Sequence, residues 1–230
     1  ERSDGILQVR SVNRDESVTV PIADLAPPER IDWRAYVLGP FWAMARAGHP
    51  IVGADVLVEG EVPFGGGLSS SASVEVALVA LAASMADIPL PATEIARLAR
   101  RAENAFCRVP CGAMDQVASA CGRADHALLL DCRTLVATPV PMPADWRIVV
   151  ADSGVRHAVA GPEYARRQEE CAEGMAVLRD MFPDLTTARD LTMEMLTDHR
   201  DRLSAVSFRR LRHVVTENAR CQAARSALAR

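Results

Sequence analysis

A glycine- and serine-rich junction constrains this chain more than any other feature. Residues 54–62 alternate apolar and polar side chains and predict a strand, whereas residues 72–85 are almost entirely apolar and predict a buried helix. Between them lies Gly65-Gly66-Gly67-Leu68-Ser69-Ser70-Ser71. Glycines permit positive φ and close approach to a ligand, and the helix start offers unpaired N–H groups and a favourable dipole. The junction therefore predicts a phosphate-binding loop, with a serine-capped tight turn that binds nothing as the alternative.

Several familiar loop chemistries are excluded by the same residues. The glycines do not follow the dinucleotide-binding spacing, and no glycine completes a nucleophile elbow after Ser69. The chain contains no lysine, and all 26 basic residues are arginine. This composition excludes a Walker A lysine, a protein-kinase strand lysine and a Schiff-base lysine within these residues.

The composition limits the binding partners and the cellular compartment that we expect for this protein. The formal net charge is −4 and no basic stripe is present, so we expect no nucleic-acid partner. No run of 18 apolar residues occurs, so we expect no membrane span. Six cysteines lack CxxC spacing, which favours a reduced, cytoplasmic protein over a disulfide framework. A zinc site on Cys107 and Cys111 is disfavoured because no Cys/His pair follows at zinc spacing.

The remaining pattern predicts a mixed helical and sheet protein. We expect a hairpin in residues 5–22, strands at 127–131 and 148–152, and a break or kink at Gly39-Pro40. We expect one helix capped by Asp32, one capped by Thr93 that runs to Phe106, and one that begins near Met114. Two long helices are expected at about 162–182 and 207–229. Pro141-Met142-Pro143 is a candidate hinge, which predicts domains at residues 1–142 and 143–230.

Two carboxylates suit phosphoryl transfer. Glu103 lies on the helix expected to end at Phe106, and Asp115 lies in the first turn of the next. One carboxylate could hold Mg²⁺, and the other could orient and deprotonate an attacking hydroxyl. The alternatives are a solvated helix residue for Glu103 and a favourable helix-start charge for Asp115.

Several segments together resemble the GHMP kinase superfamily, and galactokinases in particular. Pro63 to Ser73 resembles the central ATP motif, and Cys111-Gly112-Ala113-Met114-Asp115-Gln116 resembles the segment that carries the galactokinase catalytic aspartate. Further matches are His126 to Arg133, Ser153 to His157, Glu163-Tyr164 with Arg166-Arg167, and Arg212 to Val215. The resemblance implies an α+β fold with two domains. The first holds a mixed β-sheet with helices, and the second begins an α/β sandwich.

The resemblance also implies roles for individual residues. Gly65, Gly66, Gly67, Leu68, Ser69, Ser70 and Ser71 would wrap the ATP phosphates, and Trp33 would lie near the adenine. Ser71 and Glu103 would help hold Mg²⁺. Asp115 would be the base at the C1 hydroxyl of galactose, with Gly112 and Tyr164 also contacting the sugar. Arg156 resembles a buried support, with a surface salt bridge as an equal alternative.

The implied reaction is transfer of the ATP γ-phosphate to the C1 hydroxyl of galactose, which gives galactose 1-phosphate. The family's first and third motifs have no counterpart here, so we expect an inactive piece of a cytoplasmic, monomeric kinase. The alternatives are a kinase for N-acetylgalactosamine or arabinose, a non-catalytic sensor of galactose and ATP, and an interaction module with a fortuitous glycine loop.

Overall fold

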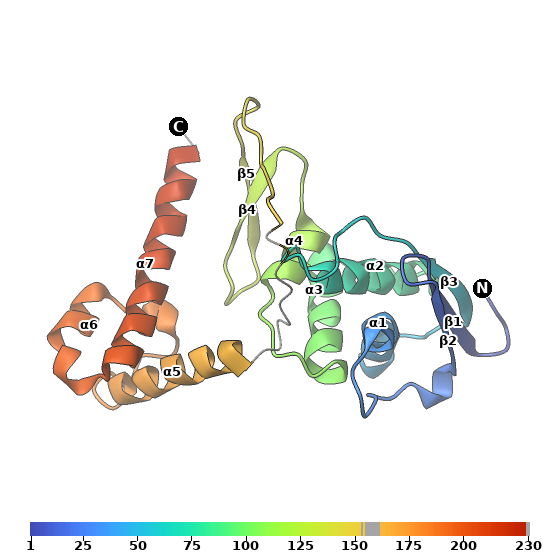
Figure 1. Ribbon diagram of the computed structural model, residues 1–230, viewed down its shortest axis with the longest axis horizontal. Helices are drawn as coiled ribbons and strands as arrows, with labels where there is room; N and C mark the ends of the chain where they lie inside the picture. The colour runs from blue at the N-terminus through green and yellow to red at the C-terminus, as the bar shows by residue number, and fades with distance from the viewer. Residues whose placement is uncertain (153, 155–161, 229–230) are drawn as a thin grey trace. The chain divides into compact units, whose positions relative to one another are not determined.

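A computed structural model describes residues 1–152, 154 and 162–228 (Figure 1). Its elements combine helices with small sheets, which confirms the predicted α+β class. The described residues fall into two units: Glu1–Pro139 belong to the first, and the helices from residue 162 onward belong to the second. The domain boundary between residues 142 and 143 stays a prediction. None of the described helices is both long and apolar enough to cross a membrane.

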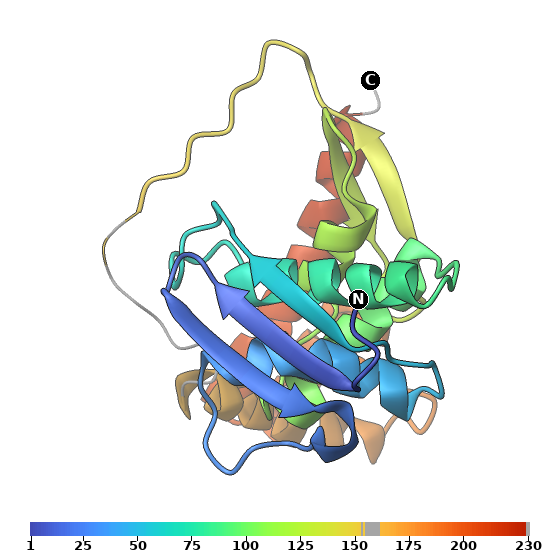
Figure 2. The same cartoon turned by 90° about the vertical axis from the view of Figure 1, so that its right-hand side faces the viewer.

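The first unit is built on a three-stranded sheet with the order β2-β1-β3. Strands β1 (Ile6–Ser11) and β2 (Glu16–Pro21) form the predicted hairpin, while β3 (Ala54–Val58) pairs with β1 in parallel. Strand β3 is shorter than the predicted 54–62. Helices α1 and α2 lie against one face of this sheet (Figure 2). Alternate residues of β1 and β3 are buried on that face, as a period of two requires.

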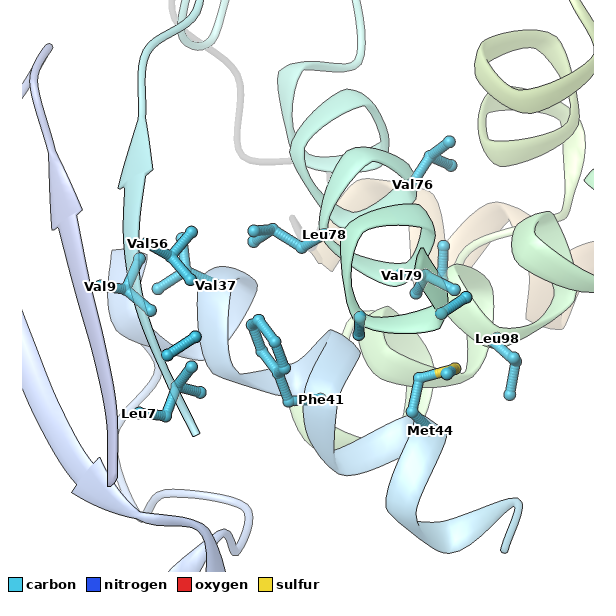
Figure 3. Close-up of a cluster of buried hydrophobic side chains, with 14 residues drawn as sticks. Leu7, Val9, Val37, Phe41, Met44, Val56, Val76, Leu78, Val79 and Leu98 are labelled. Atoms are coloured by element: carbon cyan, nitrogen blue, oxygen red, sulfur yellow. The ribbon is translucent and has the colours of Figure 1, made fainter. Parts of the chain in front are cut away.

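Helix α1 (Trp33–Arg46) begins at the predicted cap. The Asp32 carboxylate accepts a hydrogen bond from the Arg34 N–H at 2.9 Å. The helix runs through Pro40 without splitting, and a short 3₁₀ turn, η1 (Ile22–Asp24), precedes it. Phe41 of α1 lies between the sheet and the next helix (Figure 3). This apolar core positions the start of α2.

Helix α2 (Ser70–Met85) is buried as predicted and crosses α1. Helix α3 (Ala92–Arg101) starts after Pro91, so the prediction that Thr93 caps it was wrong. Pro91 has an extended backbone that cannot continue a helix backwards, and Thr93 already lies in the first turn. At Ala102 the chain changes to a π-helix, η2 (Ala102–Phe106). Helix α4 (Met114–Cys121) starts where the sequence predicted.

In residues 126–152, the predicted strand at 127–131 is confirmed, the strand at Ala137–Pro141 was not predicted, and the predicted strand at 148–152 is wrong. Strands β4 (His126–Leu130) and β5 (Ala137–Pro141) form a two-stranded sheet. The predicted strand at 148–152 is not formed, and Ile148, Val149 and Val150 are 77%, 87% and 60% exposed. An apolar β-branched run becomes a strand only beside a partner, and none pairs with it in the described part of the chain.

From residue 162 onward, the described part of the second unit is helical. Helices α5 (Pro162–Arg179) and α7 (Ala205–Leu228) are the two long helices predicted, and α6 (Met193–Asp198) lies between them in sequence. Two 3₁₀ turns, η3 (Ala188–Asp190) and η4 (Arg200–Arg202), complete the connection. Leu178, Leu196 and Leu211 form the centre of its core. A Gly174 Cβ would lie 2.8 Å from Leu211, so α5 and α7 approach closely there.

Candidate functional site

The glycine–serine loop is open and has an unusual backbone. Gly65 and Gly67 have φ of +66° and +78°, and Ser69 has φ +54° and ψ +49°. A left-handed conformation costs a non-glycine residue about 1–2 kcal/mol, and such strain often marks a functional position. Phe64 and Leu68 flank the glycines with half-exposed side chains. The loop is therefore accessible, and Ser69 is held in a conformation that it does not prefer.

The loop leads directly into the first turn of α2. The Ser69 N-cap accepts no side-chain capping bond, and its carbonyl accepts the first helical bond from Ser73 N–H at 3.1 Å. The N–H groups of the first turn have no partner within the helix, and the helix dipole places positive charge there. With the partly buried Ser70 and Ser71 beside them, these groups offer an anion several hydrogen bonds.

Glu103 is buried and not solvated. Its side chain lies on η2 at 5% exposure, so the solvated-residue alternative is wrong. Its Oε2 accepts a hydrogen bond from Gln116 Nε2 at 2.5 Å and lies 3.4 Å from Cys111 Sγ. Gln116 directly follows Asp115 on α4. The hydrogen bond therefore connects η2 to the helix turn that carries the predicted base.

Glu75 is a site residue that the sequence reasoning missed. It is fully buried, lies one helical turn after Ser71, and its Oε1 is 3.9 Å from Cys107 Sγ. Burial, followed by the negative charge of Glu103, raises the pKa of Glu75 well above its ordinary value. Glu75 is the one charged residue of α2. A single acid in an otherwise apolar helix was the signal that could have revealed it.

Burial also acts on the two thiols of this cluster. It raises the pKa of Cys111 to about 12, with the charge of Glu103 as the next cause. The pKa of Cys107 is raised in the same way, first by burial and then by Glu75. Both therefore remain thiols at neutral pH, and the reactive form of cysteine is suppressed.

Asp115 is the second residue of α4 and is partly buried. The helix start is Ala113, which supplies no side-chain cap, so the Asp115 carboxylate lies at an uncapped helix start. A carboxylate in that position interacts favourably with the helix dipole. Gly112, just before it, is exposed, and a Cβ there would meet nothing within 4 Å. The turn thus presents bare backbone and a carboxylate together.

The described elements bring part of the predicted set together. Helix α2 contacts both η2, which carries Glu103, and α4, which carries Asp115, so these three elements pack together in the first unit. Trp33 begins α1, and its indole N–H donates to Glu16 Oε2 at 2.8 Å. Tyr164 lies on α5 in the second unit at 41% exposure. Its contact with the sugar stays a prediction, and Arg156 lies outside the described residues.

The predicted Mg²⁺ ligands, Ser71 and Glu103, both carry side-chain oxygen atoms. The described residues contain no group of three or more His, Cys, Asp or Glu side chains suited to hold a metal ion. Proteins that use Mg²⁺ with a nucleotide commonly hold it with one or two groups of their own plus the phosphates. A serine hydroxyl and a carboxylate are oxygen ligands of the kind it prefers, so Ser71 and Glu103 fit by chemistry.

Comparison with known proteins gives a consistent picture. Residues 35–123 match the family model of the GHMP kinases N terminal domain. The chain is 39% identical over 228 residues to a galactokinase of Chloroflexus aurantiacus, which covers 99% of this chain and 58% of that protein. It is 41% identical over 228 residues to a galactokinase of Streptomyces coelicolor, covering 96% of this chain and 57% of that protein.

A solved structure agrees with the fold. Lactococcus lactis galactokinase in complex with galactose superposes with a TM-score of 0.87 at 26% identity, covering 99% of this chain and 60% of that one. The chain thus spans about three-fifths of the length of the relatives it matches. Residues 35–123 are thus similar to the GHMP kinase N-terminal domain, and the chain is similar to galactokinases over nearly its whole length.

Proposed function

We propose that the full-length protein that carries this chain is a galactokinase, which transfers the γ-phosphoryl group of ATP to the C1 hydroxyl of galactose. The observations that carry the proposal are the positive-φ loop that leads into α2, the packing of α2 against η2 and α4, and the buried Glu103–Gln116 hydrogen bond between η2 and α4. The similarity to galactokinases over nearly the whole chain supports it. A cytoplasmic monomer is the state that we expect.

The loop and the start of α2 bind the ATP phosphates in this proposal. The backbone N–H groups from Gly65 to Ser71 and the serine hydroxyls donate hydrogen bonds to phosphate oxygens. Trp33 lies near the adenine. Ser71 and Glu103 hold Mg²⁺, which supplies positive charge against the phosphates when it is bound.

Asp115 acts on the sugar. Its carboxylate accepts the hydrogen bond of the C1 hydroxyl, orients that oxygen towards the phosphorus atom and takes its proton. Gly112 contacts the sugar through its backbone, and Tyr164 contacts it through its hydroxyl.

A coupled ADP-release assay on the full-length protein tests the proposal. Galactose, N-acetylgalactosamine and arabinose are offered separately with Mg-ATP, and Asp115→Asn is the matched variant because it keeps the shape and removes the base. We expect galactose-dependent release that falls at least 100-fold in Asp115→Asn, while galactose binding changes much less. Release with another sugar would move the assignment to that sugar. ATP binding without release on any sugar would favour the sensor.

A further inference from the structure

Asn104 binds both backbone groups of Cys111, in the turn before α4. Its Oδ1 accepts a hydrogen bond from the Cys111 N–H at 2.8 Å. Its Nδ2 donates to the Cys111 carbonyl at 3.3 Å, and Arg100 Nε donates to the same oxygen at 3.4 Å. We call this pair of Asn104 bonds the Cys111 clamp. A planar carboxamide that binds both groups of one residue fixes the orientation of that residue's backbone.

The clamp lies between two backbone anchors. Val109 N–H donates to the Glu103 carbonyl at 3.0 Å, and Val117 N–H donates to the Ala113 carbonyl at 3.0 Å. Gly112, between these anchors, has no side chain to pack and meets nothing at its Cβ position. Arg108 nearby has a strained φ of +56°. The Asn104 side chain thus holds the turn where packing does not.

The π-helix η2 explains how two consecutive residues, Glu103 and Asn104, can both bind the segment around this turn. Cys107 N–H donates to the Ala102 carbonyl at 3.0 Å, the wide hydrogen-bond pattern of a π-turn. Glu103 binds Gln116 on α4, and Asn104 binds Cys111 at the turn. The two residues attach η2 to both ends of the segment that carries Gly112 and Asp115.

We propose that Asn104 is a positioning residue for the sugar and the base. It acts through the Cys111 backbone and sets the separation between the Gly112 backbone and the Asp115 carboxylate. The proposal rests on the galactokinase function proposed above. Displacement of a reacting group by about 1 Å can reduce a rate about 100-fold, so loss of the clamp should affect chemistry more than folding.

The chain offers a matched control. Asn13 holds Gly60 with the same pair of bonds: Nδ2 donates to the Gly60 carbonyl at 2.8 Å, and Oδ1 accepts from the Gly60 N–H at 2.9 Å. Gly60 lies outside the turn that carries Gly112 and Asp115. Asn13→Leu therefore removes an equivalent clamp without touching the sugar turn.

The experiment compares Asn104→Leu, Asn104→Asp and Asn13→Leu in the full-length protein. Galactose binding is measured by calorimetry without ATP, and kcat and KM for each substrate, melting temperature and hydrogen exchange of residues 109–115 are recorded. We expect Asn104→Leu to lower kcat/KM for galactose about 10- to 100-fold and to speed exchange in 109–115, with KM for ATP unchanged. Asn104→Asp keeps the acceptor and should recover part of the loss. Asn13→Leu should leave galactose affinity unchanged.

The outcomes separate the two proposals. If the unmodified protein turns over galactose and Asn104→Leu keeps the wild-type galactose affinity and kcat, the role of Asn104 is overturned. The proposed function is then unaffected. An equal loss of galactose affinity in Asn13→Leu would also overturn the role of Asn104, because the effect would then be general destabilisation. Absence of galactose binding and turnover in the unmodified protein would remove the proposed function and this role with it. If Asn104→Leu does not fold, the comparison rests on Asn104→Asp.

Discussion

Single backbone conformations distinguish the loop from an ordinary turn. Six non-glycine residues have positive φ in the described part of the chain, and two of them lie at the two ends of α2. Asp87 follows the C-terminus of α2, where its N–H donates to Ser84 and the next N–H donates to Ala83, a pattern that stabilises a helix end. Ser69 precedes the N-terminus without a capping bond in return. Its strain has no structural compensation at the helix start and fits a role in binding.

Glycine substitution at the two positions tests this difference. We expect Asp87→Gly and Ser69→Gly each to stabilise the protein by up to about 1 kcal/mol, because glycine adopts positive φ without a Cβ penalty. Only Ser69→Gly should weaken ATP binding, since it alone loosens the loop and removes a hydroxyl. Melting temperature and ATP affinity by calorimetry measure the two effects. Equal ATP affinity in both variants would show that the Ser69 conformation serves folding only.

The site residues that could be identified from the sequence are those that form a pattern with their neighbours along the chain. The glycine–serine run and the helix-start position of Asp115 were visible because neighbours in sequence form them. Glu75, Gln116 and Asn104 were not assigned, because their partners lie 5 to 32 residues away and meet only after α2, η2 and α4 pack. Burial of Glu103 was also not predicted, because its partner Gln116 lies 13 residues away in the sequence.

At the scale of elements, α1 positions η2 by a close approach at one glycine. A Cβ on Gly39 would lie 3.3 Å from both Ala102 Cβ and Phe106 Cδ1. Because Ala102 and Phe106 are the first and last residues of η2, the contact spans the π-helix. The missing side chain of Gly39 therefore lets α1 support the segment that holds Glu103 and Asn104. The sequence reading treated Gly39-Pro40 only as a possible break in the helix.

Gly39→Val should destabilise the protein through overpacking. The two added methyl groups would push against Ala102 and Phe106, and overpacked cores lose about 1–3 kcal/mol. Ala45→Val is the control, because Ala45 lies exposed on the same helix and reports only the helix preference of valine. The free energy of unfolding is measured by urea denaturation. A Gly39→Val loss no larger than that of Ala45→Val would contradict the close approach.

In the second unit, one ion pair joins the two long helices. Arg210 Nε on α7 donates to Glu170 Oε2 on α5 at 2.6 Å, and both side chains are partly buried. The hydrogen bond from Arg210 holds the pKa of Glu170 below its ordinary value of 4.5. A lowered folded pKa contributes stability above the unfolded pKa, and that stability is lost as pH falls through the folded pKa.

Glu170→Gln should therefore destabilise the protein at pH 7 and progressively less below pH 4.5. Urea midpoints between pH 7 and pH 3 measure the difference between the variant and the original chain. Glu163→Gln is the control, since its 2.7 Å pair with Arg166 lies on one helix and is more exposed. A constant Glu170→Gln deficit across this pH range would show that the charge of Glu170 is not the source.

At the scale of the whole molecule, the 230-residue chain leaves apolar surface uncovered. Trp146, Ile148, Val149 and Val150 are all more than half exposed in a segment with strong strand preference. The β-branched residues of this run favour a strand, but a strand needs a partner that no described element supplies. The galactokinases that this chain matches are longer, and the chain covers 57–58% of them.

The 230-residue chain should self-associate through this segment. Exposed β-branched runs without charge pair readily with other copies, and one acidic residue within the run opposes that pairing. We expect Val149→Asp to reduce association in sedimentation velocity, whereas Val136→Asp, at a site that is 59% exposed, should leave it unchanged. Equal association in all three chains would place the contact elsewhere. A loss in Val149→Asp alone would identify residues 148–150 as the surface that an added strand covers.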